Sequence, residues 1–276
     1  MKTIRQFLLF IVVSLPFVAI AQQTNSDKPL DGFYERVSPM EREVIPYDHI
    51  RESDVFWHRR VWRVIDVNEK MNFPFQYNNS DWLDVKPLIV VLMDGLKSGE
   101  ITGFNEDNFK TKTDFQEASK RGGAGYDTVP KYDPSTGEVI GDTVVYNDFD
   151  NSAVKRYRIK EDWFIDEETS TMQCRIIAIA PLYKDEQLGD IPLFWAAYND
   201  LRKVLVKNDV FNPKNDAIRF SWDDLFEARM FSSYIIKESN VFDRKISEYS
   251  SGIDALMESE RIKSDVFEKE HNMWSF

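Results

Sequence analysis

A single cysteine, Cys174, stands among the 276 residues of this chain, so no disulfide within the chain can hold its fold together. The fold must therefore rest on a hydrophobic core. Hydrophobic residues make up 42% of the chain and aromatic residues 14%, which is enough to build such a core. Cys174 itself lies in the strand-like run 172–180, whose apolar neighbours predict a buried and unreactive thiol.

The first 21 residues have the features of a cleavable export signal. Lys2 and Arg5 give a positive start, residues 7–20 are mostly apolar, and small residues at 19 and 21 fit a peptidase site. The alternative is an uncleaved membrane anchor, but the apolar run 7–20 is shorter than the roughly 20 residues that a helix needs to span a bilayer. We therefore predict export, with Gln22 as the mature N-terminus. No cysteine lies near that site, so a lipid anchor there is not expected.

Apolar periodicity predicts mainly helices. The predicted helices cover 54–71, 83–96, 113–120, 193–207, 223–238 and 253–274. The best β-hairpin joins 155–166 to 171–180. The sequence therefore predicts an α+β, helix-rich fold with a small antiparallel β-hairpin or sheet between helical blocks. Residues 22–50 are expected to form an extended N-terminal segment, and 51–276 a single domain with an exposed excursion at about 121–152.

The charge balance argues against nucleic acid as a partner. The chain has 35 Lys and Arg against 47 Asp and Glu, a net charge of −12, whereas nucleic-acid binders need cations to displace counterions. No motif of catalysis or metal binding emerges either. The three histidines lack metal-ligand spacing, no Gly-x-Ser-x-Gly occurs, and residues 122–125 lack the Gly-Lys-Ser/Thr ending of a phosphate loop. We predict no enzymatic activity, and no catalytic, cofactor-binding or metal-binding residue.

Residues 56–63 place two tryptophans and three arginines within eight positions. Trp and Arg are enriched at the centres of protein–protein interfaces. The alternative is a helix with its Trp face in the core and its Arg face in water. Seven tryptophans in a chain without a catalytic motif favour a component of an assembly. The candidate partner contacts are three arginines and three acids of the 142–150 loop: Arg59, Arg60, Arg63, Asp142, Asp148 and Asp150.

Several long blocks resemble the GldN/PorN family. They are DVFWHRRVWRVIDVNEKMN at 54–72, DGLKSGEIT at 94–102, VFNPKND at 210–216, RMFSSYI at 229–235, KESN at 237–240 and FEKEHNMW at 267–274. These blocks follow the family's order over about 31–276.

The resemblance implies a periplasmic structural subunit of the type IX protein secretion system and gliding machinery. Such a subunit would self-associate in a ring with a GldK/PorK-type outer-membrane lipoprotein and contact the GldM/PorM motor protein. It would lie at the inner face of the outer membrane, associated with the membrane only through partners. The family implies no cofactor.

Two other functions remain open from the residues alone. One is an exported hydrolase or glycan-binding protein with an unrecognised carboxylate site, which needs a cleft with converging acids. The other is a carbohydrate-binding module, which needs a row of exposed tryptophans on a sheet.

Overall fold

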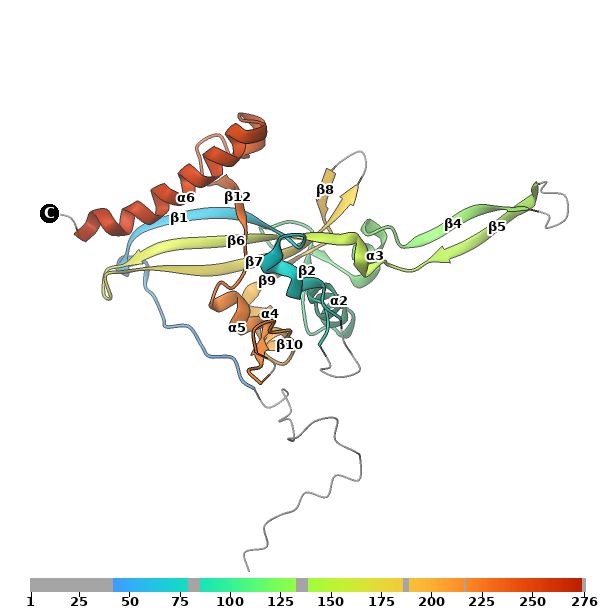
Figure 1. Ribbon diagram of the computed structural model, residues 1–276, viewed down its shortest axis with the longest axis horizontal. Helices are drawn as coiled ribbons and strands as arrows, with labels where there is room; N and C mark the ends of the chain where they lie inside the picture. Colours follow the sequence, from blue (N-terminus) through green and yellow to red (C-terminus); the bar gives the residue numbers. More distant parts are fainter. Residues whose placement is uncertain (1–41, 79–84, 133–138, 186–188, 216, 275–276) are drawn as a thin grey trace, which may run out of the picture. The chain divides into compact units, whose positions relative to one another are not determined.

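An eight-stranded antiparallel sheet dominates the computed structural model, which describes residues 42–78, 85–132, 139–185, 189–215 and 217–274 (Figure 1). The strand order is β12-β1-β6-β7-β9-β2-β3, and β8 pairs with β7. All the described residues belong to one compact unit. The expectations for residues 1–21 and for most of 22–50 lie outside the described residues.

The strands of the main sheet are β1 (Val55–Asp66), β2 (Gly103–Phe104), β3 (Lys112–Thr113), β6 (Val154–Asp166), β7 (Thr171–Asp185), β8 (Gly189–Pro192), β9 (Trp195–Ala197) and β12 (Tyr234–Glu238). Two further pairs are β4 (Gly125–Tyr132) with β5 (Val139–Asn147), and β10 (Asp209–Val210) with β11 (Phe220–Ser221). The α-helices are α2 (Leu88–Ser98), α3 (Phe115–Arg121), α4 (Tyr198–Leu205), α5 (Trp222–Glu227) and α6 (Gly252–Trp274). Short 3-10 helices are η2 (Glu52–Asp54), η3 (Lys70–Gln76), η4 (Asn151–Ala153) and η5 (Ile246–Glu248).

The prediction of a helix-rich fold with a small sheet was wrong, because helix and strand each make up about a third of the structure. The largest error is the predicted helix 54–71, most of which is strand β1. Val61, Val64 and Ile65 have helical spacing, and all three are buried. In the strand, Val64 and Ile65 point to opposite faces, and both faces are covered there. A strand buried on two sides loses the alternation that marks it in a sequence.

The predicted helix 223–238 was also wrong over its second half. Helix α5 ends at Glu227, and Arg229 then adopts a left-handed backbone with φ 52° before β12 begins. The predicted helix 193–207 begins late, at Tyr198, because β9 precedes it. Helices α2, α3 and α6 and the β6–β7 hairpin were predicted correctly within a few residues.

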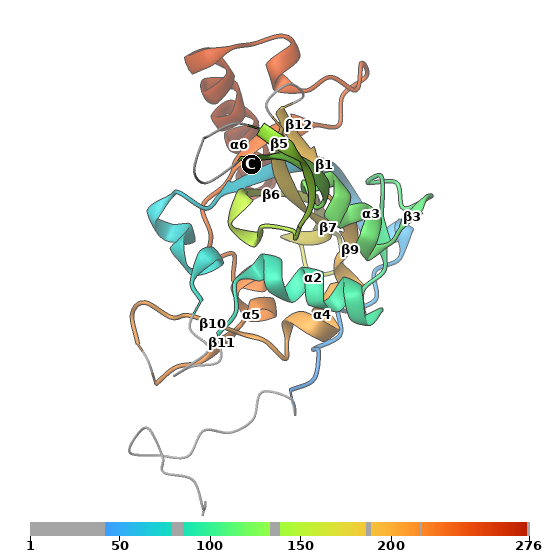
Figure 2. The same cartoon turned by 90° about the vertical axis from the view of Figure 1, so that its right-hand side faces the viewer.

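The main core lies between the sheet and helices α2, α4 and α5. Apolar residues of these helices pack on Ile65, Tyr157 and Ile159 of the sheet. Figure 2 shows these three helices gathered together, with α6 apart from them beside β12. Phe75 packs at the centre, with its ring 5.2 Å from Trp222 and 5.6 Å from Tyr157. None of the described helices has the length and apolarity needed to cross a membrane.

A buried ionic contact joins α4 to α5. Arg202 donates two hydrogen bonds from Nε and Nη2 to the Asp223 carboxylate at 3.0 and 3.1 Å, and Tyr198 donates a third at 3.0 Å. All three side chains are buried. The start of α5 is fixed next to this contact, because the Ser221 hydroxyl accepts from the Asp224 amide and so caps the helix.

Replacing Asp223 by alanine is expected to cost about 3 kcal/mol of unfolding free energy, because it removes the hydrogen-bonded counter-charge of the buried Arg202 and leaves it with the more distant Glu227 at 3.9 Å. Urea denaturation measures this loss. Lys203→Ala, on the exposed side of α4, should change the unfolding free energy by less than about 0.5 kcal/mol. Equal effects of the two changes would show that the buried pair does not hold α4 to α5.

Candidate partner-binding groove beside helix α6

Helix α6 has apolar side chains on two sides. On one side Ile262 and Val266 are buried against the sheet. Four further apolar side chains point away from the core: Ile253, Leu256, Met257 and, at the margin next to Val266, Phe267. These four side chains, here called the outer face of α6, are 62–76% exposed. A helix on a protein surface usually has one apolar side, so the outer face indicates a partner.

The inner side of α6 packs on the edge of the main sheet. Ile262 joins a cluster with Val61 of β1, Ile235 of β12 and Ile246 of η5. The Ser259 hydroxyl accepts a hydrogen bond of 2.9 Å from the Ile235 amide, which ties the helix to the edge strand β12. This packing holds the outer face of α6 in a fixed position.

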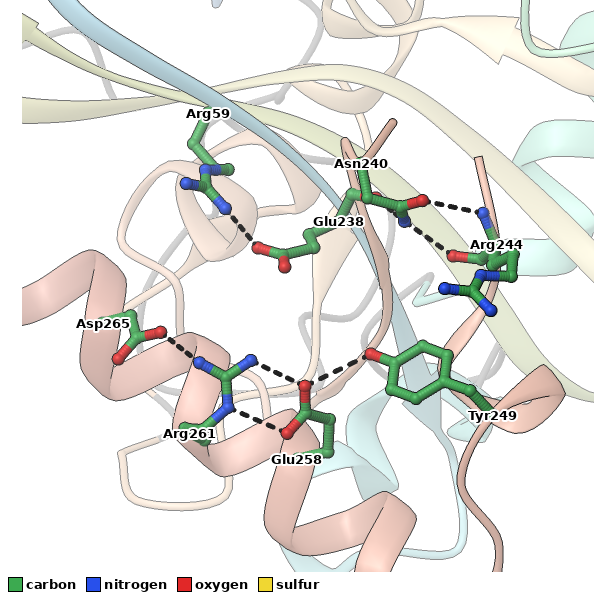
Figure 3. Close-up of polar contacts among 8 residues, drawn as sticks. All are labelled: Arg59, Glu238, Asn240, Arg244, Tyr249, Glu258, Arg261 and Asp265. Carbon is green, nitrogen blue, oxygen red and sulfur yellow. Dashed lines mark hydrogen bonds and ion pairs between the residues drawn. The ribbon is translucent and has the colours of Figure 1, made fainter. Parts of the chain in front are cut away.

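A groove of about 330 Å³ runs between β1 and the second half of α6. Trp57 and Arg59 line it from β1, Glu238 from β12, and Val266 and Asp265 from α6. Arg59 and Glu238 form an ion pair of 2.5 Å that faces the helix (Figure 3). The groove thus combines a half-buried indole with an ion pair, which suits the binding of a protein side chain.

Ion pairs along α6 flank this groove. Arg261 contacts Glu258 at 2.6 Å and Asp265 at 2.5 Å, and the Tyr249 hydroxyl donates to Glu258 at 3.3 Å (Figure 3). The hydrogen bond from Arg261 lowers the pKa of Glu258 below its usual value. Two acids of the groove, Glu238 and Asp265, therefore have basic partners within the chain.

The loop after β12 presents two more apolar side chains, Val241 and Phe242, which are 97% and 72% exposed. Asn240 shapes the loop, because its side chain accepts from the amides of Phe242 and Arg244 and donates to the Arg244 carbonyl at 2.9 Å (Figure 3). The Arg244 guanidinium lies 4.5 Å from the centre of the Phe242 ring. The loop is thus held open by local hydrogen bonds while its apolar side chains face solvent.

The three arginines predicted as partner contacts do not share one face. Arg59 lines the groove, whereas Arg60 points to the opposite side of the sheet and binds Asp162 with two hydrogen bonds of 2.6 and 2.7 Å. Arg63 is only 7% exposed and donates to Ser233 at 3.0 Å. Burial lowers the pKa of Arg63, although nearby Glu161 opposes this effect. A partner contact remains a prediction for all three, and Arg59 is the most suitable one to test.

The three predicted acids lie on or after the β4–β5 hairpin. Asp142 is in β5, and its side chain is outside the described residues. Asp148 is exposed, and Asp150 accepts from the amide and hydroxyl of Ser152 at 2.8 Å. No described contact joins these acids to the three arginines, so a role for them in binding a partner also stays a prediction.

Cys174 has no features of a nucleophile. It is largely buried in β7, and Arg229 donates to its sulfur at 3.1 Å. Burial, together with Glu161, raises the pKa of the thiol well above its usual value. Among the described residues, no group of three or more His, Cys, Asp or Glu side chains could hold a metal ion.

The outer face of α6 was missed in the sequence. The helix itself was predicted, but its residues were not sorted by direction around the axis. Arranging the residues around the helix axis separates 253, 256, 257 and 267 from the buried 262 and 266 and shows a second apolar side. Glu238 was missed because it was assigned to the end of a helix, when it lies opposite β1 as the partner of Val61 in the sheet.

Because Asp162 pairs with Arg60, we expect the folded protein to lose stability at acidic pH. Burial raises the pKa of Asp162, but Arg60 and His58 outweigh burial and lower it below the ordinary value of 3.8. Because the folded pKa is lowered, this stabilisation is complete above pH 3.8 and is lost as the pH falls below it. Melting temperatures from pH 7 to pH 3 should show this loss. Arg60→Met should reduce this acid-dependent loss, and an unchanged pH profile would contradict the assignment.

Comparison with known families gives one match. A family model described as "Gliding motility associated protein GldN" matches residues 50–275, which include the groove and all of its lining residues. No curated protein matches the chain. Since the family model covers most of the chain, the protein belongs to the GldN family of gliding motility associated proteins.

Proposed function

We propose that this protein is a non-catalytic structural subunit of the type IX protein secretion and gliding machinery. In this proposal it is exported to the periplasm and forms a ring with a GldK/PorK-type outer-membrane lipoprotein. The ring contacts a GldM/PorM-type motor protein, and the subunit is held at the membrane only by these partners. Membership of the GldN family supports the link to gliding motility.

The observation that carries the assembly role is the outer face of α6. Four large apolar side chains are exposed on it, and Val241 and Phe242 lie exposed in the loop that follows the edge strand β12. Exposing such a set in water is unfavourable by about 25 cal/mol for each Å² of apolar surface. Binding of a partner over the outer face of α6 would remove this unfavourable exposure, which persists in an isolated subunit.

A ring imposes a geometric requirement that this surface can meet. Subunits of a ring contact one another head to tail, so each needs two different surfaces. The outer face of α6 offers one surface. The β4–β5 hairpin offers a second, on which Tyr126, Val144 and Tyr146 are exposed. We assign α6 to one contact and leave the hairpin, with Asp148 and Asp150, as a candidate for the second.

Charged substitutions on the outer face of α6 test the proposal. Leu256→Glu and Phe267→Glu should each greatly reduce recovery of the tagged protein in a large particle from detergent-solubilised envelopes. Both side chains are more than half exposed, so the melting temperature of the purified subunit should be unchanged.

Gln116→Glu is the matched control, because it adds the same charge at an exposed position on α3. It should leave the large particle intact. Wild-type recovery of the large particle by both α6 variants would contradict the assembly role of this face.

A further inference from the structure

The face of the sheet opposite to α6 contains a separate pocket. Neighbouring residues of a strand point to opposite faces, and Val61 packs under α6, so Trp62 faces the other side. Trp62 is paired with Lys160 in β6, and Val64 with Arg158, which places Arg158 on the same face as Trp62. This face of the sheet therefore places Trp62 next to two basic side chains, Lys160 and Arg158.

The pocket has a volume of about 300 Å³. Trp62, Arg158 and Trp195 line it from three strands, and Lys237 and Lys245 line it from β12 and the segment beyond. The loop at 105–107 adds Glu106 and Asp107, and Pro192 and Ile236 complete the wall. A pocket of this size admits one or two side chains of a partner.

Arg158 is the unusual residue of this pocket. Its Nε is buried without a hydrogen bond, and within the described part of the chain its guanidinium forms neither a hydrogen bond nor an ion pair. Burial lowers the pKa of Arg158, although Asp190 and Asp107 at longer range oppose this effect. Arg158 as a whole is partly exposed, and the atom that is buried without a partner is its Nε, which costs free energy because that N–H has no acceptor. An anion bound in the pocket would remove this cost.

Several other polar groups of the pocket have partners within the chain. The Trp62 indole donates to Asp107 at 2.9 Å, and Lys160 contacts the same carboxylate at 3.5 Å. Lys237 pairs with Asp243 at 2.6 Å and lies 4.5 Å from the centre of the Trp62 ring. These contacts fix the indole next to the unpaired Arg158, so the binding surface is formed before any ligand arrives.

The charges that remain indicate the kind of ligand. With Lys160–Asp107 and Lys237–Asp243 paired, Arg158, Lys245 and Glu106 are left, a net charge of about +1. A single carboxylate balances this charge, whereas a phosphate with nearly two charges would exceed it. The indoles of Trp62 and Trp195 give apolar walls for the carbon chain of an acidic residue.

We propose that this pocket binds a Glu or Asp side chain from an acidic segment of a protein partner, with Arg158 as the main contact for the carboxylate. The site lies on the opposite face of the sheet from α6, and it does not depend on the assembly role proposed for the outer face of that helix. It gives the subunit a second, charge-selective docking point.

A peptide titration of the full chain tests this site. The probe is a tetraglutamate peptide, acetylated and amidated at its ends, and the readout is the ¹H–¹⁵N signals of the Trp62 and Trp195 indoles. We expect saturable shifts of both signals. In Arg158→Met the affinity should fall about tenfold or more, which corresponds to about 1.4 kcal/mol. Lys184→Met removes one positive charge from an exposed position on β7 and should bind like the wild type.

The stability of Arg158→Met separates a binding residue from a structural one. Methionine keeps a carbon chain of similar length and removes the unpaired charge with its buried Nε, so the free protein should melt at or above the wild-type temperature. A clearly lower melting temperature would make Arg158 structural and overturn the proposal. Absent indole shifts, unchanged affinity in Arg158→Met, or tighter binding of inorganic phosphate than of the peptide would overturn it as well.

Discussion

The pairing of β1 with β6 decides which side chains lie on each face of the main sheet. The two strands are in register from Trp57 to Asp66, so each residue of β1 has a fixed face. One face receives Val61 under α6 and Ile65 under the main helices, and the other receives Trp62 beside Arg158. A shift of one residue would exchange these faces and remove both the core contacts and the two candidate binding sites.

The same strand explains what the sequence could and could not predict. Isolated helices with strong local signals, α2 and α6, and the turn-connected β6–β7 hairpin were predictable. Strand β1 was not, because its partners β6 and β12 lie roughly a hundred and more residues away, and its buried centre mimics a helical pattern. The resemblance to the GldN/PorN family was recognisable in continuous blocks and is confirmed as membership of the GldN family.

The candidate sites show a similar division. Trp57 and Arg59 stood out in the sequence as part of a Trp and Arg cluster, and both line the groove beside α6. Arg63 belonged to the same cluster but is buried near Glu161 in the interior. Arg158 could not be selected from the sequence, because what sets it apart is that its buried Nε has no hydrogen-bond acceptor. That property depends on side chains from three other segments and is visible only in the folded protein.

We propose that the outer face of α6 is covered by another subunit in the cell envelope. The most direct measurement places a photo-crosslinking amino acid at position 256 or 267 and irradiates intact cells. If another subunit covers this face, both positions should give a crosslinked product with another protein chain, and position 116 on α3 should give none. No crosslink from 256 and 267, or an equal yield from 116, would contradict it.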